Sequence, residues 1–371
     1  MGKIISEDKK LWYKIARNII KAGGIPLPVS ESLIEISKTV ITEDQAKKII
    51  LHFKKPSMNI DQLITKTKLD KKTLIKMLNN LIRSGVIVAL PSRNTGDIVY
   101  YLLGPVPGIF ERTFMTGKTG EREKKLAKLF EAYFKDIGDG YKNNYDDTMK
   151  LFEQIPPIYR IVPIEEEIEE YEEYVLPYEE VSKIIEKFDI IAVSDCYCRH
   201  QRELLNDACK INAPKKNCLT FGKNARFNIE FNFGEEISKD EAKILLKEAE
   251  DIGLVHRAFH ARQDPKKDEF AICNCCKCCC EISHSFYNGE IPINALTSYK
   301  ALVFEDLCVG CEICVEKCPM EAIKLTNSII QINMGRCIGC GICAYHCPQE
   351  AMKLERTGPR KVIVPIPKVI T

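Results

Sequence analysis

The sequence predicts an α+β fold made of several small domains. Three observations support this: a helix, helix, hairpin pattern in the N-terminal third, a cysteine-rich middle segment, and two similar cysteine runs near the C-terminus. A chain of 371 residues can bury more than one core, because a domain usually has about 100–200 residues. We expect a helical domain over 1–120, a helix and acidic linker over 121–180, a small cysteine-rich α+β module over 181–295, and a C-terminal domain over 296–371.

The N-terminal third carries the helical and hairpin pattern. Residues 59–69 predict a short helix, and Asp70 caps a second one that ends at Gly85. The segments VIVAL and DIVYYLL alternate around the polar turn PSRNTG, which indicates a β-hairpin. Apolar helices around 33–41 and 45–53 would complete a small core. This order of elements is typical of a winged helix.

A winged helix can bind DNA or serve as a protein scaffold, and its charge helps to choose between these roles. Residues 59–103 hold seven basic and three acidic side chains, a modest net charge of +4. The second helix offers Lys71, Lys72 and Lys76, whereas the wing offers only Arg93. We therefore interpret the domain as a scaffold, with DNA contact as the alternative.

The linker region begins with an amphipathic pattern. The segment 121–138 predicts a packing helix, since apolar residues recur along one face. Seven glutamates follow between Glu165 and Glu173, bounded by prolines, and indicate a surface linker. A docking site for a basic partner is the less favoured interpretation of this charge run.

The middle module is defined by its thiols. A buried strand over 190–193 is expected to lead into CYCRH. A helix is expected to begin at the capping box of Ser238 and Glu241 and to end at Gly253. The strands expected for LVHRAF and DEFAICN then lead into CNCCKCCC. We interpret this helix, strand, strand order as a second winged-helix-like unit. The module holds ten thiols, the candidate metal ligands Cys196, Cys198, Cys209, Cys218, Cys273, Cys275, Cys276, Cys278, Cys279 and Cys280.

Several kinds of site are compatible with these ten thiols. The sequence shows neither an export signal nor a stretch of about 18 apolar residues, so we expect a cytoplasmic chain without membrane insertion, whose thiols bind metal rather than form disulfides. A further Fe–S cluster, a tetrahedral zinc and reactive thiols all remain open, because the spacing does not decide. Arg199, His200 and Arg202 could donate to cluster sulfur, receive an anionic substrate, or be ordinary loop charges.

The C-terminal domain contains the pattern C-x2-C-x2-C-x3-C-P twice. In this pattern three thiolates hold one [4Fe–4S] cluster and the fourth holds the other. Two [4Fe–4S] clusters are therefore predicted, the first on Cys308, Cys311, Cys314 and Cys347, the second on Cys337, Cys340, Cys343 and Cys318. The two runs align residue for residue, so duplication predicts pseudo-twofold symmetry, with Gly310, Gly339 and Gly341 at the tight bends. The domain resembles two-cluster bacterial-type ferredoxins.

The whole layout, including PPIYRIVPI, VLPYEEVSKII, CYCRH and CNCC, resembles multidomain 4Fe–4S ferredoxin-like proteins of anaerobic bacteria and archaea. The resemblance implies cluster binding, electron transfer in anaerobic metabolism and redox partner proteins. We expect an electron carrier or an oxidoreductase subunit more than a stand-alone enzyme. The alternatives are an Fe–S reductase with substrate at the middle thiols and a redox-responsive winged-helix regulator. The sequence gives no basis for an oligomeric state. The tail VIVPIPKVIT predicts an irregular extended segment, because its prolines discourage a regular strand.

Overall fold

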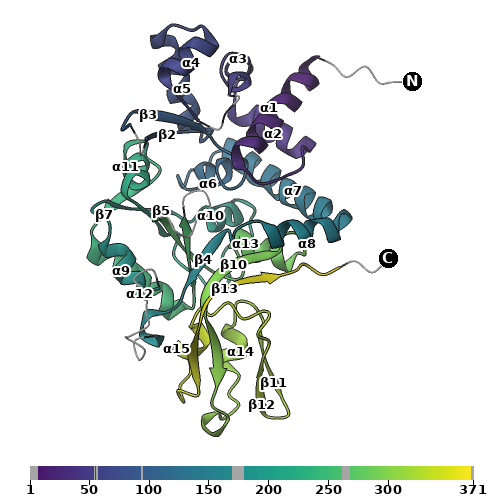
Figure 1. Cartoon of the computed structure of the whole chain (residues 1–371), viewed down its shortest axis with the longest axis vertical. Helices are drawn as coiled ribbons and strands as arrows, with labels where there is room; N and C mark the ends of the chain where they lie inside the picture. The colour runs from purple at the N-terminus through teal and green to yellow at the C-terminus, as the bar shows by residue number, and fades with distance from the viewer. Residues whose placement is uncertain are drawn as a thin grey trace. The chain divides into compact units, whose positions relative to one another are not determined.

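The computed structural model describes residues 7–368, with the exception of 54, 56, 93–94, 169–178 and 261–267. The chain divides into two compact units (Figure 1). Unit 1 contains the residues up to Gly140 together with Asp195–Ala208 and Phe227–Glu235, and unit 2 contains Tyr141–Ser194, Cys209–Arg226 and the residues from Glu236 onward. The four boundaries expected from the sequence remain a prediction. Within the described ranges, no helix combines the length and apolar character that crossing a membrane requires.

Unit 1 is mainly helical, with one small antiparallel sheet in the order β1–β3–β2. Its elements are α1 (Glu7–Gly23), α2 (Glu31–Val40), α3 (Glu43–Lys48), η1 (Ile50–His52), β1 (Ser57–Asn59), α4 (Ile60–Thr67), α5 (Lys71–Arg83), β2 (Ile87–Pro91), β3 (Ile98–Leu102), α6 (Ile109–Phe114), α7 (Glu121–Asn143), which extends past Gly140, and α10 (Tyr197–Leu204). The helix α11 (Gly222–Glu230) continues from unit 2 into unit 1.

The helix, helix, hairpin order expected after Asn59 is present as α4, α5, β2 and β3. Asp70 caps α5 by accepting a hydrogen bond from the Thr73 amide at 3.0 Å, and Gly85 follows the helix with a φ of +78°. The hairpin pairs Ile87 with Leu102, and β1 adds a third strand to it. Lys71, Lys72 and Lys76 are exposed, whereas Arg93, expected on the wing, lies outside the described residues.

Aromatic side chains form the core around α6, α7 and α10. Phe110 lies edge-on to Phe114, Phe130, Phe134 and Tyr197, with ring centroids 5.2–5.7 Å apart. Such aromatic pairs stabilise the fold by more than the burial of their apolar area alone. The packing helix expected over 121–138 is therefore confirmed as α7, and Phe110 of α6 lies between it and α10, the helix that contains Cys198.

Unit 2 is built on a mixed sheet, which in the described part of the chain has eight strands in the order β13–β10–β4–β8–β9–β6–β5–β7. The strands are β4 (Tyr159–Val162), β5 (Ile191–Asp195), β6 (Lys216–Phe221), β7 (Glu235–Ile237), β8 (Val255–His260), β9 (Glu269–Cys275), β10 (Ile293–Val303) and β13 (Met352–Val364), and β5 and β7 extend into unit 1 by one residue each. The hairpin expected from LVHRAF and DEFAICN exists as β8 and β9. These strands lie inside the large sheet, so the middle module does not end in the separate wing that we expected.

The helices of unit 2 include α8 (Tyr145–Gln154), α9 (Val181–Glu186), α12 (Lys239–Ile252) and α13 (Glu281–Tyr287). The capping box predicted at Ser238 and Glu241 begins α12, and Gly253 ends it in a left-handed conformation. Apolar side chains of α9 and α12 form one core with those of the central strands, among them Ile184, Leu246 and Ile272. The acidic segment contributes a short turn, η2 (Glu165–Glu167), and its glutamates from Glu169 onward lie outside the described residues.

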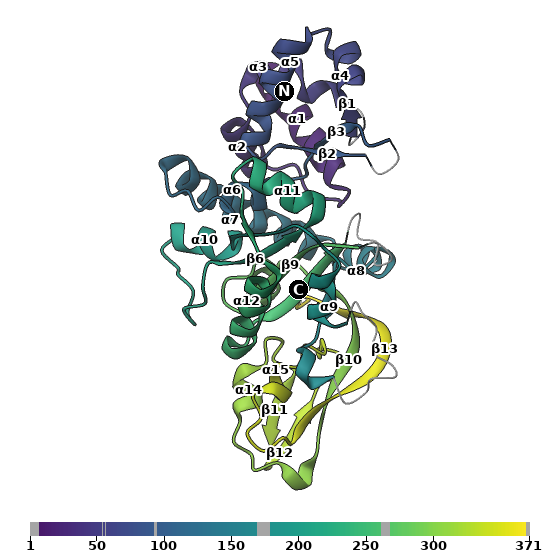
Figure 2. The same ribbon diagram turned by 90° about the vertical axis from the view of Figure 1, so that its left-hand side faces the viewer.

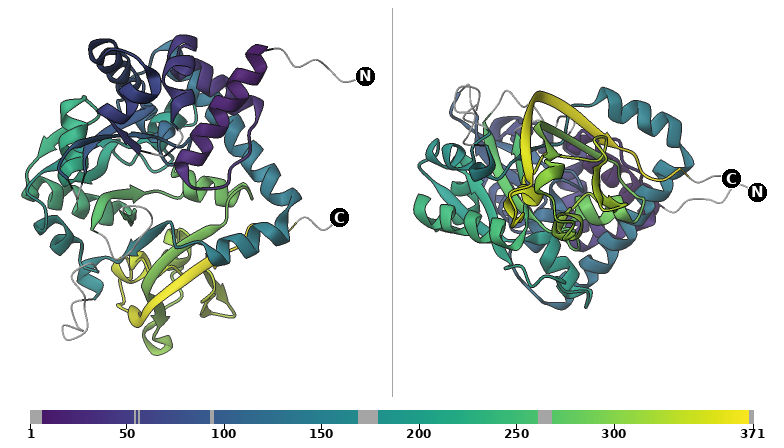
Figure 3. Two further views of the ribbon diagram at one scale, coloured as in Figure 1. Left: turned by 45° about the horizontal axis from the view of Figure 1, so that its top comes forward. Right: turned by 90° about the horizontal axis from the view of Figure 1, so that it is seen from below.

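The C-terminal cysteine runs lie between β10 and β13, which pair antiparallel from Ile293 with Val364 to Val303 with Met352. Figures 2 and 3 show these two long strands, green and yellow, side by side. Between them lie η5 (Glu305–Leu307), α14 (Ile313–Lys317), α15 (Ile342–Tyr345) and the hairpin of β11 (Ile323–Thr326) and β12 (Ile329–Ile332). The cysteine segment is thus an insertion in a hairpin of the large sheet.

The expectation of an irregular tail was wrong for its first part. Val362 and Val364 are buried at the end of β13. The strand tolerates Pro359 because it is the edge of the sheet and because the register shifts near that point, between Thr297 and Tyr299 of β10. A proline at an edge or bulge removes no ladder hydrogen bond. Residues 365–368 follow without regular structure.

Candidate metal centres

The duplication of the cysteine runs is visible in the backbone. Left-handed residues recur at equivalent positions of the two runs, Gly310 with Gly339, Glu312 with Gly341 and Glu321 with Glu350. In each run a short helix, α14 or α15, carries the third cysteine and ends before the fourth. The same bends therefore direct the cysteines of both runs, as the pseudo-twofold repeat predicts.

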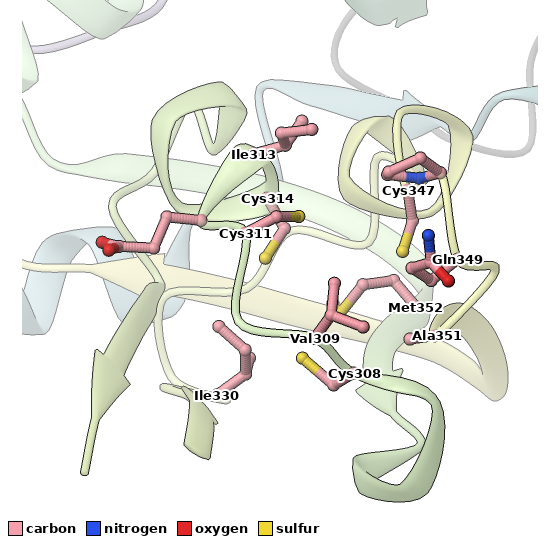
Figure 4. Close-up of a pocket in the computed structure, with 12 residues that line it drawn as sticks. Cys308, Val309, Cys311, Ile313, Cys314, Ile330, Cys347, Gln349, Ala351 and Met352 are labelled. Atoms are coloured by element: carbon pink, nitrogen blue, oxygen red, sulfur yellow. The ribbon is translucent and has the colours of Figure 1, made fainter. Parts of the chain in front are cut away.

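Two small cavities lie between the runs, and their linings cross from one run to the other. The first is lined by Cys308, Cys311 and Cys314 of run one and by Cys347 of run two, and Figure 4 shows their sulfur atoms around a common space. The second is lined by Cys337, Cys340 and Cys343 of run two and by Cys318 of run one. The structure thus brings together each set of four cysteines that the spacing predicts.

The linings of both cavities suit a cluster bound by thiolates. Apolar residues such as Ile313 and Ile330 line the first, and Ile323, Ile338 and Leu354 line the second. Burial raises the pKa of Cys340 to about 12 and that of Cys314 to about 11. Deprotonated thiols in such surroundings need compensating positive charge, which iron supplies.

Backbone and cationic groups surround the second cavity. The amide of Ala301 donates to the Sγ of Cys337 at 3.4 Å, and the amide of Ala322 donates to the Sγ of Cys318 at 3.3 Å. Arg360 donates to the carbonyl oxygens of Tyr299 and Cys337 at 3.0 and 2.8 Å. Donors of this kind stabilise the negative charge of a thiolate-bound group.

Four of the ten middle cysteines form a compact group in unit 2. The Sγ atoms of Cys209, Cys276, Cys278 and Cys279 all lie within 4.8 Å of one another. Cys276 and Cys279 are buried, whereas Cys209 and Cys278 are half-buried. Ala213, Ala249 and Leu254 pack against the group. None of the cysteines in the described part of the chain forms a disulfide.

A second thiol group surrounds the side chain of Arg257 on the large sheet. Cys218 of β6, Cys273 of β9 and Arg257 of β8 are direct cross-strand partners, so they share one face of the sheet. Cys275 lies two residues along β9 on that same face, and Cys280 accepts a hydrogen bond from Arg257. Hydrogen bonds to the Cys273 and Cys280 side chains, together with burial, raise the pKa of Cys275.

The remaining two middle cysteines, Cys196 and Cys198, lie in unit 1 at the start of α10. The basic residues beside them bind the neighbouring helices. His200 contacts the carbonyl oxygen of Phe114 through Nδ1 at 2.7 Å, and Arg202 pairs with Glu131 and with Asp207. Of the three side chains considered for cluster or substrate contact, His200 and Arg202 thus hold α10 in place.

Sequence reasoning missed Arg257. In the same strand, the buried His256 contacts Asn274 through Nδ1 at 2.7 Å and Glu250 through Nε2 at 3.2 Å. The available signal was the one arginine of this predicted strand, because a cation that becomes buried needs a partner.

Comparisons with known proteins match a small part of the chain. Residues 301–348 match the family model of the 4Fe–4S dicluster domain. A segment of 31 residues is 58% identical to ABC transporter E family member 1 of Arabidopsis thaliana, which covers 8% of this chain and 5% of that protein. The chain therefore spans a small fraction of that relative's length. No solved structure matches this chain. These matches support an iron–sulfur, ferredoxin-like protein with a 4Fe–4S dicluster domain at residues 301–348.

Proposed function

We propose that this chain is an electron-transfer protein with two [4Fe–4S] clusters that connects a low-potential donor to a partner oxidoreductase. The observation that carries the proposal is the crossed lining of the two cavities, each with three thiols of one run and the fourth of the other. One-electron transfer is the chemistry that such clusters supply when bound. Cys308, Cys311, Cys314 and Cys347 would hold the first, and Cys337, Cys340, Cys343 and Cys318 the second.

The exposure of the two cysteine sets differs, and this difference indicates where a partner approaches. Cys311 is exposed, and Leu307 and Val309, which flank Cys308, are 51% and 67% exposed. Cys318, Cys337 and Cys343 of the second set are buried. Exposed apolar side chains are typical of contact surfaces between proteins. We infer that a redox partner contacts the protein beside Cys308 and Cys311.

A second candidate function, a reductase centre at the middle thiols, is favoured by one cavity of unit 2. This cavity of about 580 Å³ is lined by Cys278 of the compact thiol group and by Pro319, which follows the cluster residue Cys318. Lys210, Lys277 and Lys317 also line it, and Lys277 pairs with Glu321 at 2.6 Å. Glu316 and Glu321 line it as well, so the cavity offers both cationic and anionic side chains to a small polar substrate.

We further propose that residues 57–102 form a winged-helix-like module. The order of α4, α5, β2 and β3 and the third strand β1 support this interpretation. Its role as a scaffold predicts no DNA binding beyond a weak, salt-sensitive background. Salt-dependent binding that is lost in a K71A/K72A/K76A variant would favour the regulator instead.

The decisive experiment is the determination of iron, acid-labile sulfide and zinc per chain after anaerobic purification, with EPR of the dithionite-reduced protein. Two clusters require about eight irons and about eight sulfides. About four irons per chain or fewer, or EPR signals of a different cluster type, would contradict the proposal of two clusters. A clear excess above eight with matching sulfide would add a cluster at the middle thiols.

A further inference from the structure

We propose that Cys209, Cys276, Cys278 and Cys279 bind one metal ion, zinc or iron, in a closed tetrahedral four-thiolate site. This site would be separate from the two [4Fe–4S] clusters and does not depend on the electron-transfer proposal. The proposal assigns four of the ten middle thiols as ligands of a single ion.

The distances between the sulfur atoms fit one ion. The Sγ of Cys209 lies 3.9 Å from that of Cys276 and 3.7 Å from that of Cys278, and the sulfurs of Cys278 and Cys279 are 3.6 Å apart. A tetrahedron of thiolates around one ion, with metal–sulfur bonds of about 2.3 Å, has edges of about 3.8 Å. The observed separations therefore match the edges of that tetrahedron.

The same distances disfavour the two other uses of these thiols. In a [4Fe–4S] cluster each thiolate binds a different iron, so the four sulfurs stand around the whole cubane and are much further apart. A disulfide would bring two sulfurs to about 2.05 Å and leave the others aside. Here three of the six separations are 3.6–3.9 Å and all six lie within 4.8 Å, a spacing that suits one central ion.

The fold explains why one cysteine distant in sequence joins three adjacent ones. Cys276, Cys278 and Cys279 follow directly on β9, and the register of β9 with β6 places Cys273 opposite Cys218. Cys209 belongs to the loop that leads into β6. Pairing of the two strands therefore brings both loops to the same end of the sheet, and an ion there would lock the loops together.

The charged side chains near the four thiols are also compatible with a metal–thiolate site. Four thiolates and one divalent ion carry a net charge of −2, which nearby cations would stabilise. Lys210 follows Cys209 directly, Lys277 lies between Cys276 and Cys278, and both line the cavity that Cys278 also lines. The four protein ligands leave no open position on the ion, which is typical of a structural site.

The test combines metal analysis of the full-length protein with X-ray absorption at the zinc and iron edges. We expect one ion per chain beyond the iron that matches sulfide. If the ion is zinc, the zinc-edge spectrum should show about four sulfurs at about 2.3 Å without metal–metal scattering, and if it is iron, the oxidised protein should show the ferric tetrathiolate EPR signal beside the clusters. The C209S and C278S variants, both at half-buried positions, should each lose about one ion per chain and no sulfide. Zinc would make the site structural, whereas iron with a ferric tetrathiolate spectrum would make it a one-electron site, and both support the proposal.

A matched control is C311S, at an exposed thiol of the first C-terminal set. It should lose iron together with sulfide and keep the single ion. Loss of about four irons and sulfide in C278S would overturn the proposal in favour of a cubane. Absence of any excess ion in the wild type would overturn it as well. Because the absorption spectrum is recorded on the wild type, the proposal stays testable when a variant fails to fold.

Discussion

The guanidinium of Arg257 donates a hydrogen bond from Nη1 to the Sγ of Cys280 at 2.9 Å, in the interior of unit 2. Arg257 is fully buried, and its Nη2 donates to Ser283 at 2.9 Å. Its Nε has no acceptor among the described residues. Burial disfavours the charged form, but the thiols of Cys280, Cys275 and Cys273 and the hydroxyl of Tyr159 raise the pKa of Arg257 above its ordinary value. Arg257 therefore stays charged, and the Sγ of Cys280 is the thiol that accepts its hydrogen bond.

The first prediction concerns the coupling of this pair. Replacement of Cys280 by alanine leaves a buried cation without its partner, so C280A should lower the free energy of unfolding by about 3–5 kcal/mol. R257M removes the charge itself and should cost less, and the double variant should cost less than the sum of the two. Anaerobic urea unfolding of the four proteins, with metal content measured in parallel, gives the coupling energy. Strictly additive losses would show that the two residues do not act as a pair.

The second prediction uses two equivalent glycines of the repeat. Gly339 has a φ of +64°, and a Cβ there would collide with the backbone carbonyl of Tyr299. Gly310 has a similar φ of +70°, but the nearest atom to its Cβ would be 4.0 Å away. Both alanine variants pay the left-handed strain of about 1 kcal/mol, and only G339A adds the collision. G339A should lose the cluster of the second set, whereas G310A should retain both clusters.

Iron content and the EPR spectrum of the reduced protein distinguish these outcomes. Equal iron content and equal EPR spectra of G339A and G310A would show that the left-handed bend, rather than the contact with Tyr299, determines whether the cluster assembles.

The third prediction tests the crossed ligation directly. If Cys347 holds the first cluster, then C347A should give the same EPR spectrum as C308A, with about four irons lost from each. C318A should in turn resemble C337A. The comparison needs only the four variants and their iron content, and a match between C347A and C343A would contradict the crossed arrangement.

The fourth prediction concerns the C-terminal strand. Lys361 of β13 donates to the carbonyl oxygens of Phe152, Glu153 and Ile155 at 2.7, 2.9 and 2.6 Å, at the end of α8. A cation is favourable at this end of a helix, where carbonyls lack partners. Burial lowers the pKa of Lys361, but the ammonium is satisfied by three acceptors. K361M should lower the free energy of unfolding by about 2 kcal/mol.

The control for K361M is Lys300 on the adjacent strand β10. Lys300 pairs with Glu355 at 3.0 Å, and Glu355 is half exposed. A pair of this kind contributes at most about 1 kcal/mol, so K300M should have a small effect. Denaturant unfolding of both variants measures the difference. Equal losses of unfolding free energy in K361M and K300M would contradict the prediction that the three hydrogen bonds of Lys361 stabilise the fold.

Local signals in the sequence predicted much of the secondary structure. The capping box of Ser238 and Glu241, the cap at Asp70 and the stop at Gly253 are where the sequence places them, because each depends on residues only a few positions apart. The cysteine sets at the C-terminus were predictable for the same reason, since the ligand spacing is a local pattern.

The long-range pairing could not be predicted in this way. Nothing within Val362–Val364 shows that this segment joins a sheet whose other strands begin at Tyr159, and its flanking prolines indicated the opposite. Likewise, the spacing of Cys276, Cys278 and Cys279 does not reveal that Cys209 is their fourth neighbour. Such contacts depend on strand register, which the fold as a whole determines.

The insertion of the cysteine segment between β10 and β13 bears on the electron transfer that we propose. The segment begins after Val303 and ends before Met352, and these two residues are paired partners at the end of the antiparallel strands β10 and β13. A carrier domain that swings on a flexible tether depends on diffusion, whereas this segment has no such tether at either end. If the two proposed clusters bind in this segment, the distance between them is set by the fold, and the rate of electron transfer between them should not change with the viscosity of the solvent.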